Sequence, residues 1–412
     1  MKNYNIYDVI IIGGGASGLF CAGMCAKHGK KVLLIEKNKI LGKKLLITGK
    51  GRCNVTNNCS SEEFIASIPV NQKFMFSAAR QFSPKDTIKF FEDLGVKLKT
   101  ERGNRVFPLS DKSSDIVNAL KNFIKNEKIT VVNSEVKKLI IEEKCFKGIK
   151  TDNAEYFAHS GVICTGGKSY QATGSTGDGY NFAKSAGHTI TPIKPSLVPL
   201  SSKENWCSQL SGLALKNVSV SVRNNKTSKI IYKDFGEMLF THFGISGPVI
   251  LSASSHMKNI MPEKYSVLID LKPALNEKKL DLRILRDFNE NINKNIANAL
   301  NKLLPASIIP VIINLSGINS QVKINQLTKE QRTKLINIVK NLEVKIHSFR
   351  PIEEAIITSG GVNIKEINPK TMQSKIINGL FFAGEVIDVD AYTGGFNLQI
   401  AFSTGYLAAL NC

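Results

Sequence analysis

The sequence predicts an α/β protein whose first domain is discontinuous, because its two ends share one pattern and its middle has another. Residues 7–36 have the order strand, glycine-rich turn, helix and strand. Residues 379–410 have a buried strand, a loop with a Gly-Gly pair and a helix. Between them, residues 201–270 contain short β-rich runs, and residues 276–341 have helical spacing. We therefore expect the C-terminal segment to complete the first domain, with the middle inserted into it.

The opening segment predicts a strand, a helix and a second strand. "YDVIII" (7–12) is a continuous apolar run, which is typical of a strand buried on both faces of a parallel sheet. "ASGLFCAGMCAKHG" (16–29) predicts a helix, and "KKVLLIE" (30–36) predicts the second strand. Two cysteines of this helix, Cys21 and Cys25, are four positions apart, and we expect them to pack in the core.

The turn between strand and helix, "GGGASG" (13–18), has the glycine spacing of a dinucleotide-binding site. Gly13 permits a tight turn, Gly15 lets a pyrophosphate approach the backbone, and Gly18 lets the helix pack on the strand. The N-terminus of the helix offers free N–H groups to the phosphates. Glu36 ends the second strand, at a place where an acid would bind an adenosine ribose. Together these features predict a bound dinucleotide.

A basic loop follows the second strand. "GKKLLITGKGRCNVTNN" (42–58) contains glycines, lysines, one arginine and Cys53, and no acidic residue occurs between Lys37 and Ser61. A flexible basic segment at this place suits a negatively charged ligand. Further along, "HSGVICTGGKSYQATGSTGDGY" (159–180) predicts another buried strand and a glycine-rich polar loop that could wrap the same ligand.

The middle of the chain has its own character. Three prolines in "TPIKPSLVPL" (191–200) mark a domain boundary, and the β-rich runs after it predict a small antiparallel or barrel-like domain. The helical segment 276–340 is basic, and Lys279, Arg283 and Arg286 form one patch of its first helix. A solvated helical face explains this charge as well as a binding surface does.

The formal net charge of +21 is the most unusual global property of this chain of 412 residues. Such a charge suits a polyanionic partner such as nucleic acid; an overall Lys- and Asn-rich composition is the alternative explanation. The chain starts directly with a strand pattern, has no apolar run of the ~18 residues that cross a bilayer, and has eight cysteines without a CxxC pair. We expect a cytoplasmic protein with reduced thiols, no membrane span and no metal site.

Five segments, in order, resemble the YhiN/BaiN-like family of FAD-dependent oxidoreductases. They are "GGGASG", "LGKKLLITGKGRCNVTN", "TGGKSYQATGSTGDGY", "LFTHFGISGP" and "GLFFAGEVIDVDAYTGGFNLQIAFSTG". The resemblance spans essentially the whole chain. It implies a glutathione-reductase-like FAD-binding Rossmann domain, split by a β-barrel-like domain that carries a small helical insert. The implied divisions are 1–195 plus 355–412 for the FAD domain, 196–275 plus 341–354 for the barrel-like domain, and 276–340 for the helical insert.

The resemblance also implies where FAD lies. Its pyrophosphate would lie on the glycine turn, its ribose on Glu36 and its adenine by the backbone of Val136. The basic loop would run along the isoalloxazine side, where its Lys and Arg side chains would stabilise the phosphates or the reduced flavin. N–H groups of Asn397, Leu398 and Gln399 would face the flavin pyrimidine ring. The residues expected to contact FAD are Gly13, Gly14, Gly15, Ala16, Ser17, Gly18, Glu36, Lys37, Gly42, Lys43, Arg52, Cys53, Asn54, Val136, Thr165, Gly166, Gly167, Gly384, Glu385, Asp388, Gly395, Phe396, Asn397, Leu398 and Gln399.

The reaction that the resemblance implies is the reduction of a carbonyl-conjugated C=C bond by hydride transfer from reduced FAD, with NADH or NADPH as the electron source. Members of the family are associated with two such substrates, uridine in large-subunit ribosomal RNA and small 3-oxo bile acid-like enones. The net charge of +21 favours the RNA. The candidate catalytic residues are Cys53, Arg52 and Asn54, with Cys53 either a proton donor or a packing residue. The sequence indicates neither the particular uridine nor an oligomeric state.

Two other classes of protein are alternatives for this sequence. A flavin disulfide reductase would use a cysteine pair near Cys53 and Cys59, but five residues separate these two rather than four, and no histidine follows His347. No second strand–GxGxxG–helix unit for NAD(P)H is present either. A flavin-bearing binding protein without catalysis is the other class, and reduction of the flavin by NAD(P)H would exclude it.

Overall fold

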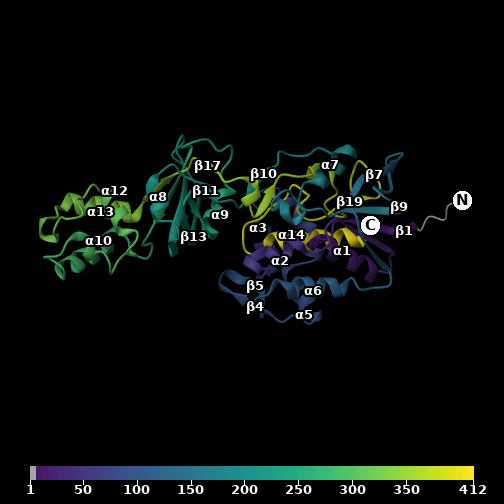
Figure 1. Cartoon of the computed structure of the whole chain (residues 1–412), viewed down its shortest axis with the longest axis horizontal. Coiled ribbons are helices and arrows are strands. Elements are labelled where there is room, and N and C mark those ends of the chain that lie inside the picture. Colours follow the sequence, from purple (N-terminus) through teal and green to yellow (C-terminus); the bar gives the residue numbers. More distant parts are fainter. Residues whose placement is uncertain (1–5) are drawn as a thin grey trace. The chain divides into compact units, whose positions relative to one another are not determined.

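The computed structural model describes residues 6–412, which divide into two compact units (Figure 1). The first unit contains the chain up to Ser196 and then Pro351–Cys412, and the second unit is Leu197–Arg350. The first unit is thus built from both ends of the chain. The helices of residues 277–340 fall in the second unit together with its sheet. No helix among residues 6–412 combines the length and the apolar character that a membrane crossing needs.

A seven-stranded sheet forms the centre of the first unit. Its strands are β1 (Ile6–Ile12), β2 (Val32–Glu36), β6 (Ile129–Asn133), β7 (Val136–Glu142), β8 (Cys145–Thr151), β9 (Glu155–Ile163) and β19 (Leu380–Phe382). The order is β6-β2-β1-β9-β8-β7, with β19 paired to β9. The β7–β8 and β8–β9 pairs are antiparallel, and the other pairs are parallel. Ile12 lies opposite both Ile35 and Ile163, so β1, β2 and β9 end at one edge. This arrangement confirms the predicted α/β class.

Two long helices pair in the first unit. These are α1 (Ala16–Lys27) and α14 (Phe396–Asn411), which lie side by side (Figure 1). Their approach is close at Gly405, where a Cβ would lie 3.0 Å from the Ser17 oxygen. Phe20 of α1 packs against Phe402 of α14, with ring centroids 5.4 Å apart. The C-terminal helix is therefore part of the core that the N-terminal segment forms.

Shorter elements complete the first unit. The helices are α2 (Lys43–Ile47), α3 (Ser61–Ala66), α4 (Phe76–Gln81), α5 (Pro84–Asp93), α6 (Ser113–Phe123) and α7 (Asp178–Ser185). A three-stranded sheet has the order β3 (Thr56–Asn57), β5 (Arg105–Pro108) and β4 (Leu98–Glu101), and β10 (Lys194–Ser196) pairs with β18 (Ile357–Ser359).

The second unit combines an antiparallel sheet with helices. The strands, in sheet order, are β16 (Leu342–Lys345), β15 (Tyr265–Asp270), β12 (Ala214–Asn224), β13 (Ile230–Thr241), β14 (Gly244–Ser246), β11 (Leu200–Ser201) and β17 (Ser348–Phe349). Only Ile346 and His347 separate β16 from β17, and their N–H groups donate to the Tyr265 oxygen at 3.0 Å and the Ser201 oxygen at 2.8 Å. One continuous segment of chain thus pairs with β15 at one end of the sheet and with β11 at the other, as in a barrel. The helices are α8 (Asn205–Gln209), α9 (Pro248–Ser254), α10 (Glu277–Asn289), α11 (Ile296–Ala299), α12 (Ile309–Leu315) and α13 (Lys329–Lys340). Leu280 and Ile284 of α10 are buried, as are Leu335 and Val339 of α13, because these helices pack together.

Candidate cofactor and active site

The glycine turn after β1 has a packed side and an open side. A Cβ on Gly13 would lie 2.6 Å from the Cys164 oxygen, and one on Gly18 would lie 1.8 Å from the Gly13 oxygen. At Gly15, by contrast, a Cβ would meet no described atom within 4 Å. No described side chain caps the N-terminus of α1 either. Packing therefore requires Gly13 and Gly18, whereas Gly15 borders open space where the phosphates of a dinucleotide would fit.

Glu36 is held beside this turn at the end of β2. Its Oε2 accepts a hydrogen bond from the Gly14 N–H at 2.7 Å, and its Oε1 accepts from the N–H and the Nδ2 of Asn38, each at 2.7 Å. The Ser134 N–H donates to the Glu36 backbone oxygen at 3.1 Å, which brings the segment before Val136 to the same edge. The residues expected to meet the ribose and adenine are thus close to the glycine turn.

The loop after β9 reaches the same edge. A Cβ on Gly13 would lie 3.1 Å from the Thr165 Cα, so the two turns touch. Gly166 follows with φ +73°, and a Cβ on Gly167 would lie 2.8 Å from the Glu385 Oε1. The Thr165 Oγ1 is buried without a described hydrogen-bond partner. A polar atom in that state is one that a bound ligand could satisfy.

Two more predicted glycines contact the turn and α1. The Gly42 N–H donates to the Gly14 oxygen at 2.8 Å. The Ser17 Oγ donates to the Ala383 oxygen at 3.4 Å, and Gly384 follows with φ +79°. The structure therefore brings together residues from four separate stretches of sequence at one edge of the sheet.

The start of α14 is the second helix N-terminus of the site. Gly395 precedes the helix with φ +95°, and a Cβ there would lie 2.3 Å from the Thr56 oxygen, so β3 packs directly on this turn. No described side chain caps the helix, which leaves the N–H groups of residues 396–398 for a ligand. The Asn397 side chain is already used, because it accepts from the Ala391 N–H at 2.9 Å and donates to the Ala391 oxygen at 2.8 Å.

The Gln399 N–H, which was expected to face the flavin pyrimidine ring, is bound within the helix. Its N–H donates to the Gly395 oxygen at 3.1 Å and so is not free for the flavin. Its fully buried side chain accepts from the Thr56 Oγ1 at 2.6 Å and the Thr87 Oγ1 at 2.8 Å, and it donates to the Phe82 oxygen at 3.1 Å. Gln399 therefore positions α14 against β3 and α5.

The lysines that follow β2 are bound to protein groups. The Lys37 Nζ pairs with Asp178 at 2.5 Å, and the Lys44 Nζ pairs with Glu385 at 2.8 Å. The Lys43 Nζ donates to a backbone oxygen of the glycine-rich loop at 2.7 Å. These contacts close the loop after β2 against the loop after β9. The charges of Lys37 and Lys44 are thus neutralised by carboxylates of the protein rather than free for a phosphate.

Arg52 is also engaged. Its guanidinium carbon lies 4.1 Å from the centroid of the Phe107 ring, and it forms ion pairs with Asp111 at 2.5 Å and with Glu101. These partners tie the basic loop to the three-stranded sheet. The arrangement favours a positioning role for Arg52 over direct contact with a substrate.

The backbone between α2 and β3 is strained. Gly49, Lys50, Gly51 and Cys53 all have φ between +57° and +82°. For the two residues that carry a Cβ, such a conformation costs about 1–2 kcal/mol each. Strain of this kind clusters at functional sites, where the surrounding structure maintains it. Asn54 follows, and its Oδ1 is buried without a described partner.

The two thiols of this region are not activated. The Cys53 side chain is fully buried, and this burial raises the pKa of its thiol to about 12. Burial likewise raises the pKa of Cys59 to about 11. A flavin disulfide reductase needs a thiol whose pKa is lowered, so both values argue against that class. Because Cys53 has no exposed surface, the structure favours packing over proton donation.

Replacing Cys53 with alanine is therefore expected to leave turnover within about twofold of the parent, while unfolding stability falls by about 1 kcal/mol. The reason is that only a buried contact is lost, and alanine keeps the same backbone strain. Steady-state turnover and thermal unfolding measure the two effects. Turnover slowed roughly 10²-fold with normal flavin reduction would instead make Cys53 the proton donor.

An acidic segment lies between β19 and α14. The Glu385 Oε1 accepts from the Thr358 N–H at 2.8 Å. Burial raises the pKa of Asp388, and it raises the pKa of Asp390 to about 6. Asp390 is 3% exposed and accepts from the Ser196 Oγ at 2.8 Å. Asp390 is two residues from Asp388 in the sequence, and only the folded structure shows that Asp390 is the more deeply buried of the two.

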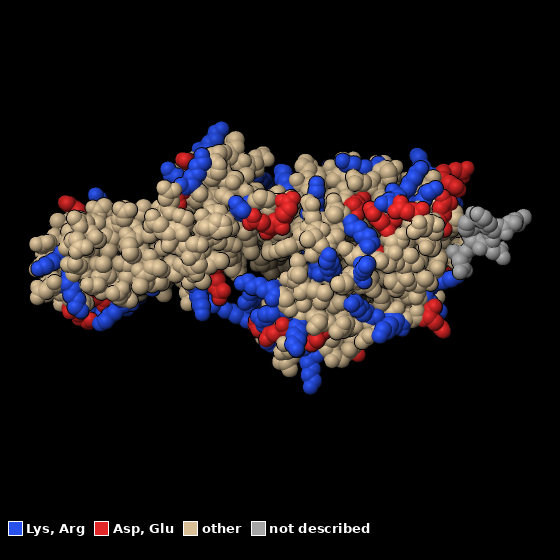
Figure 2. Space-filling model, viewed as in Figure 1, with Lys and Arg blue, Asp and Glu red and all other residues tan. Residues whose placement is uncertain are grey.

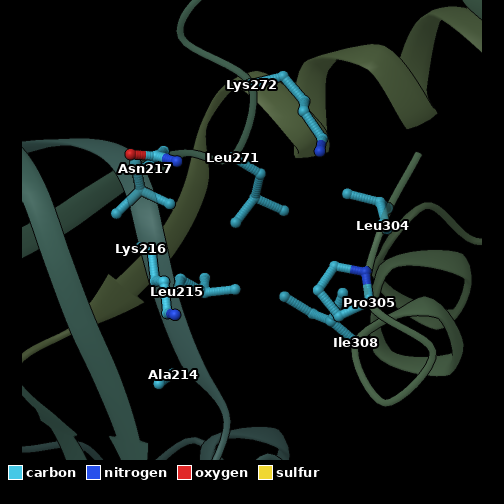
Figure 3. A pocket seen from close by; sticks show the side chains of 10 residues that line it. Ala214, Leu215, Lys216, Asn217, Leu271, Lys272, Leu304, Pro305 and Ile308 are labelled. Carbon is cyan, nitrogen blue, oxygen red and sulfur yellow. The ribbon is translucent and has the colours of Figure 1, made fainter. Parts of the chain in front are cut away.

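A cavity of about 210 Å³ lies in the second unit, between the start of β12 and the segment before α12 (Figure 3). Its wall is mainly aliphatic, and the side chain of Lys272 points toward it (Figure 3). None of the residues expected to contact FAD lines it. The lining residues are Ala214, Leu215, Lys216, Asn217, Val218, Leu271, Lys272, Leu304, Pro305 and Ile308.

Comparison with known proteins identifies the family. Residues 7–411 match the family model described as HI0933-like protein Rossmann domain. The chain belongs to this family. The HI0933-like chain is 31% identical to a ribosomal RNA dihydrouridine synthase of Haemophilus influenzae, over 100% of this chain and 99% of that protein. It is 30% identical to a 3-dehydro-bile acid delta(4,6)-reductase of Clostridium scindens, over 97% of each chain. The family is one of FAD-dependent oxidoreductases.

Solved structures share the fold of this HI0933-like chain. A 3-ketosteroid delta1-dehydrogenase from Sterolibacterium denitrificans matches with a TM-score of 0.54 and 14% identity, over 98% of this chain and 99% of that one. A 3-ketosteroid-delta4-(5alpha)-dehydrogenase from Rhodococcus jostii matches with a TM-score of 0.52 and 12% identity, over 99% of this chain and 98% of that one. These likenesses show a Rossmann-like FAD-binding α/β fold.

Proposed function

We propose that this chain reduces a carbonyl-conjugated C=C bond, with uridine in large-subunit ribosomal RNA as substrate and dihydrouridine as product. The shared chemistry of its relatives carries the proposal, because "dihydrouridine synthase" and "delta(4,6)-reductase" both name the saturation of a carbon–carbon double bond. The net charge of +21 favours RNA over a small enone, because basic surfaces bind phosphate backbones.

The first unit would bind and orient the cofactor. The turn at residues 13–18 and the N-terminus of α1 would hold the pyrophosphate, and Glu36 would hold the adenosine ribose. The N–H groups of residues 396–398 would face the pyrimidine ring, where donors stabilise negative charge. Bound FAD would supply the hydride, with electrons taken from NADH or NADPH.

Cations of the basic loop and of β5, the strand that pairs with β3, support RNA as the substrate. The Asn57 Nδ2 donates to the Gly103 oxygen at 3.0 Å and to the Gly394 oxygen at 3.1 Å, which joins the β4–β5 connection to this helix start. Arg105 of β5 and the exposed Lys50 form no ion pair within residues 6–412. On the face drawn in Figure 2, Lys and Arg are spread over both units, whereas Asp and Glu gather in a few groups. Such unpaired cations suit phosphate contacts.

A deletion strain tests this function directly. Loss of the gene is expected to remove a dihydrouridine from large-subunit ribosomal RNA, and expression of the chain is expected to restore it. Mass spectrometry of the nucleosides, followed by mapping of RNA fragments, measures the change. An unaltered dihydrouridine content in the deletion strain would refute the RNA assignment.

A small-molecule enone is the second candidate. The Clostridium scindens relative favours it, since its similarity to this chain is as extensive as that of the RNA-modifying relatives. An enone reductase would need an apolar slot and no phosphate-binding surface. The salt dependence of substrate binding therefore separates the two candidates.

A further inference from the structure

Four of the eight cysteines form a row through the first unit. Cys21 of α1 lies near Cys164, which follows β9, and near Cys25, one turn further along α1. The Cys25 Sγ in turn lies 3.5 Å from the Sγ of Cys412, which follows α14. Three of these side chains are buried, whereas Cys412 is partly exposed. The row thus leads from the region of the glycine turn to the surface.

The Cys25–Cys412 contact joins two helices, whereas Cys21 and Cys25 lie on the same rigid helix. The neighbouring Cys21 and Cys412 thiols lower the pKa of Cys25, and the charge of Lys30 acts in the same direction. The contact with Cys25 raises the pKa of Cys412, so a thiolate of this pair is held on Cys25 with the Cys412 thiol beside it. Among residues 6–412, no group of three or more His, Cys, Asp or Glu is arranged to hold a metal ion.

We propose that Cys25 and Cys412 are a reversible oxidation site, at which a hydroperoxide converts the two thiols into a disulfide. The Cys25 thiolate takes the proton of the Cys412 thiol across the 3.5 Å contact, and the partly exposed Cys412 sulfur attacks the peroxide. Cys412 becomes a sulfenic acid as the O–O bond breaks and water or an alcohol leaves. The Cys25 sulfur then attacks the Cys412 sulfur, so that an S–S bond forms and water leaves. Two electrons pass to the peroxide, and a dithiol reductant reverses the reaction.

The disulfide would connect the last turn of α1 to the end of α14. The opposite ends of the same helices are the two N-termini assigned to FAD, and the helices pack along their length. A covalent link at these ends restricts any movement of the two helix N-termini relative to each other. The oxidised protein is therefore expected to release FAD several-fold more slowly than the reduced protein.

Peptide mapping of the holoprotein treated with hydrogen peroxide tests the site. The expected result is one cross-linked peptide pair that joins Cys25 to Cys412, the loss of two free thiols, and reversal by dithiothreitol. Release of FAD into dilute buffer, followed by flavin fluorescence, measures the effect on the cofactor. These readouts do not depend on the identity of the substrate.

Cys412→Ser is the test variant, because it changes a partly exposed side chain at the end of a helix and so spares the core. It is expected to abolish both the cross-link and the slower release of FAD. Cys145→Ser on β8 is the matched control, since Cys145 is also partly exposed. This variant should leave the cross-link and the slower release of FAD unchanged. Oxidation of Cys412 to sulfinic acid without a cross-link would refute the proposed disulfide. Equal rates of FAD release from the reduced and the oxidised protein would refute its effect on the cofactor.

Discussion

Replacement of Gly15 by aspartate is expected to give a folded protein without FAD. A Cβ at this position meets no described atom within 4 Å, so the side chain fits without disturbing β1 or α1. It would, however, place a carboxylate where the pyrophosphate is expected, and the two negative charges would compete for the N-terminus of α1. We expect FAD affinity to fall by at least about 10²-fold, which corresponds to about 2.7 kcal/mol. The flavin absorbance of the purified protein measures the loss.

Two variants of the same turn control this result. Gly15→Ala adds a neutral methyl group to the open space and is expected to retain FAD. Gly18→Ala would place a Cβ 1.8 Å from the Gly13 oxygen, so it is expected to destabilise the whole first unit. Thermal unfolding separates loss of FAD through charge repulsion, which leaves the protein stable, from loss of FAD through destabilisation of the first unit. Full FAD occupancy in the Gly15→Asp protein would remove the dinucleotide assignment.

The opening turn was predictable because its determinants are local. The apolar run of β1, the glycine spacing and the position of Glu36 all lie within 36 residues of sequence. Hydrophobic periodicity and steric limits on glycine act at that range, so a single sequence reveals them. Completion of the unit by α14 was predictable for a related reason, because a second strand–loop–helix pattern ends the chain.

The role of the basic loop was not predictable, because its partners are distant in sequence. The Lys and Arg side chains of this loop were expected to stabilise the FAD phosphates or the reduced flavin. In the structure Lys44 pairs with Glu385, and Arg52 pairs with Glu101 and Asp111. Only the folded structure brings these carboxylates to the loop. Burial of Cys53 and the buried network of Gln399 depend on tertiary packing in the same way.

In the helical segment of the second unit, the helices were predictable from the sequence, but the partners of their charged side chains were not. Its helical spacing is confirmed in α10 and α13. The basic patch on α10 is less free than the sequence suggests, because the Arg283 Nε donates to Asp287 at 2.8 Å and 3.0 Å. Asp287 is 3% exposed, so reversing the charge of Arg283 would place a like charge beside a buried carboxylate and leave it only the more distant Arg286, whose Nε lies 3.8 Å away. A test of RNA binding must therefore leave Arg283 unchanged.

If ribosomal RNA is the substrate, its affinity is expected to fall steeply as salt rises. Each phosphate that a lysine or arginine neutralises releases condensed counterions, so the dissociation constant follows a power of the salt concentration. With about five phosphate contacts, the dissociation constant should rise ~10²-fold to 10³-fold between about 50 and 200 mM salt. A small enone predicts binding that hardly depends on salt. Binding of a large-subunit ribosomal RNA fragment to the holoprotein, measured across this range, separates the two substrates.

Charge reversal at Lys278 and Lys279 tests whether the start of α10 contacts RNA phosphates. Both are exposed in the first turn of α10, and neither forms an ion pair within the part of the chain that the structure describes. Glutamate is favourable near a helix N-terminus, so the double variant should fold normally. We expect RNA affinity to fall about tenfold or more and the salt slope to fall by about 2, with the flavin spectrum unchanged. The same reversal at Lys138 and Lys147 on the exposed β7–β8 ladder is the matched control. An equal loss in both double variants would mean that net charge alone attracts the RNA, and salt-independent binding by the parent would leave the enone as substrate.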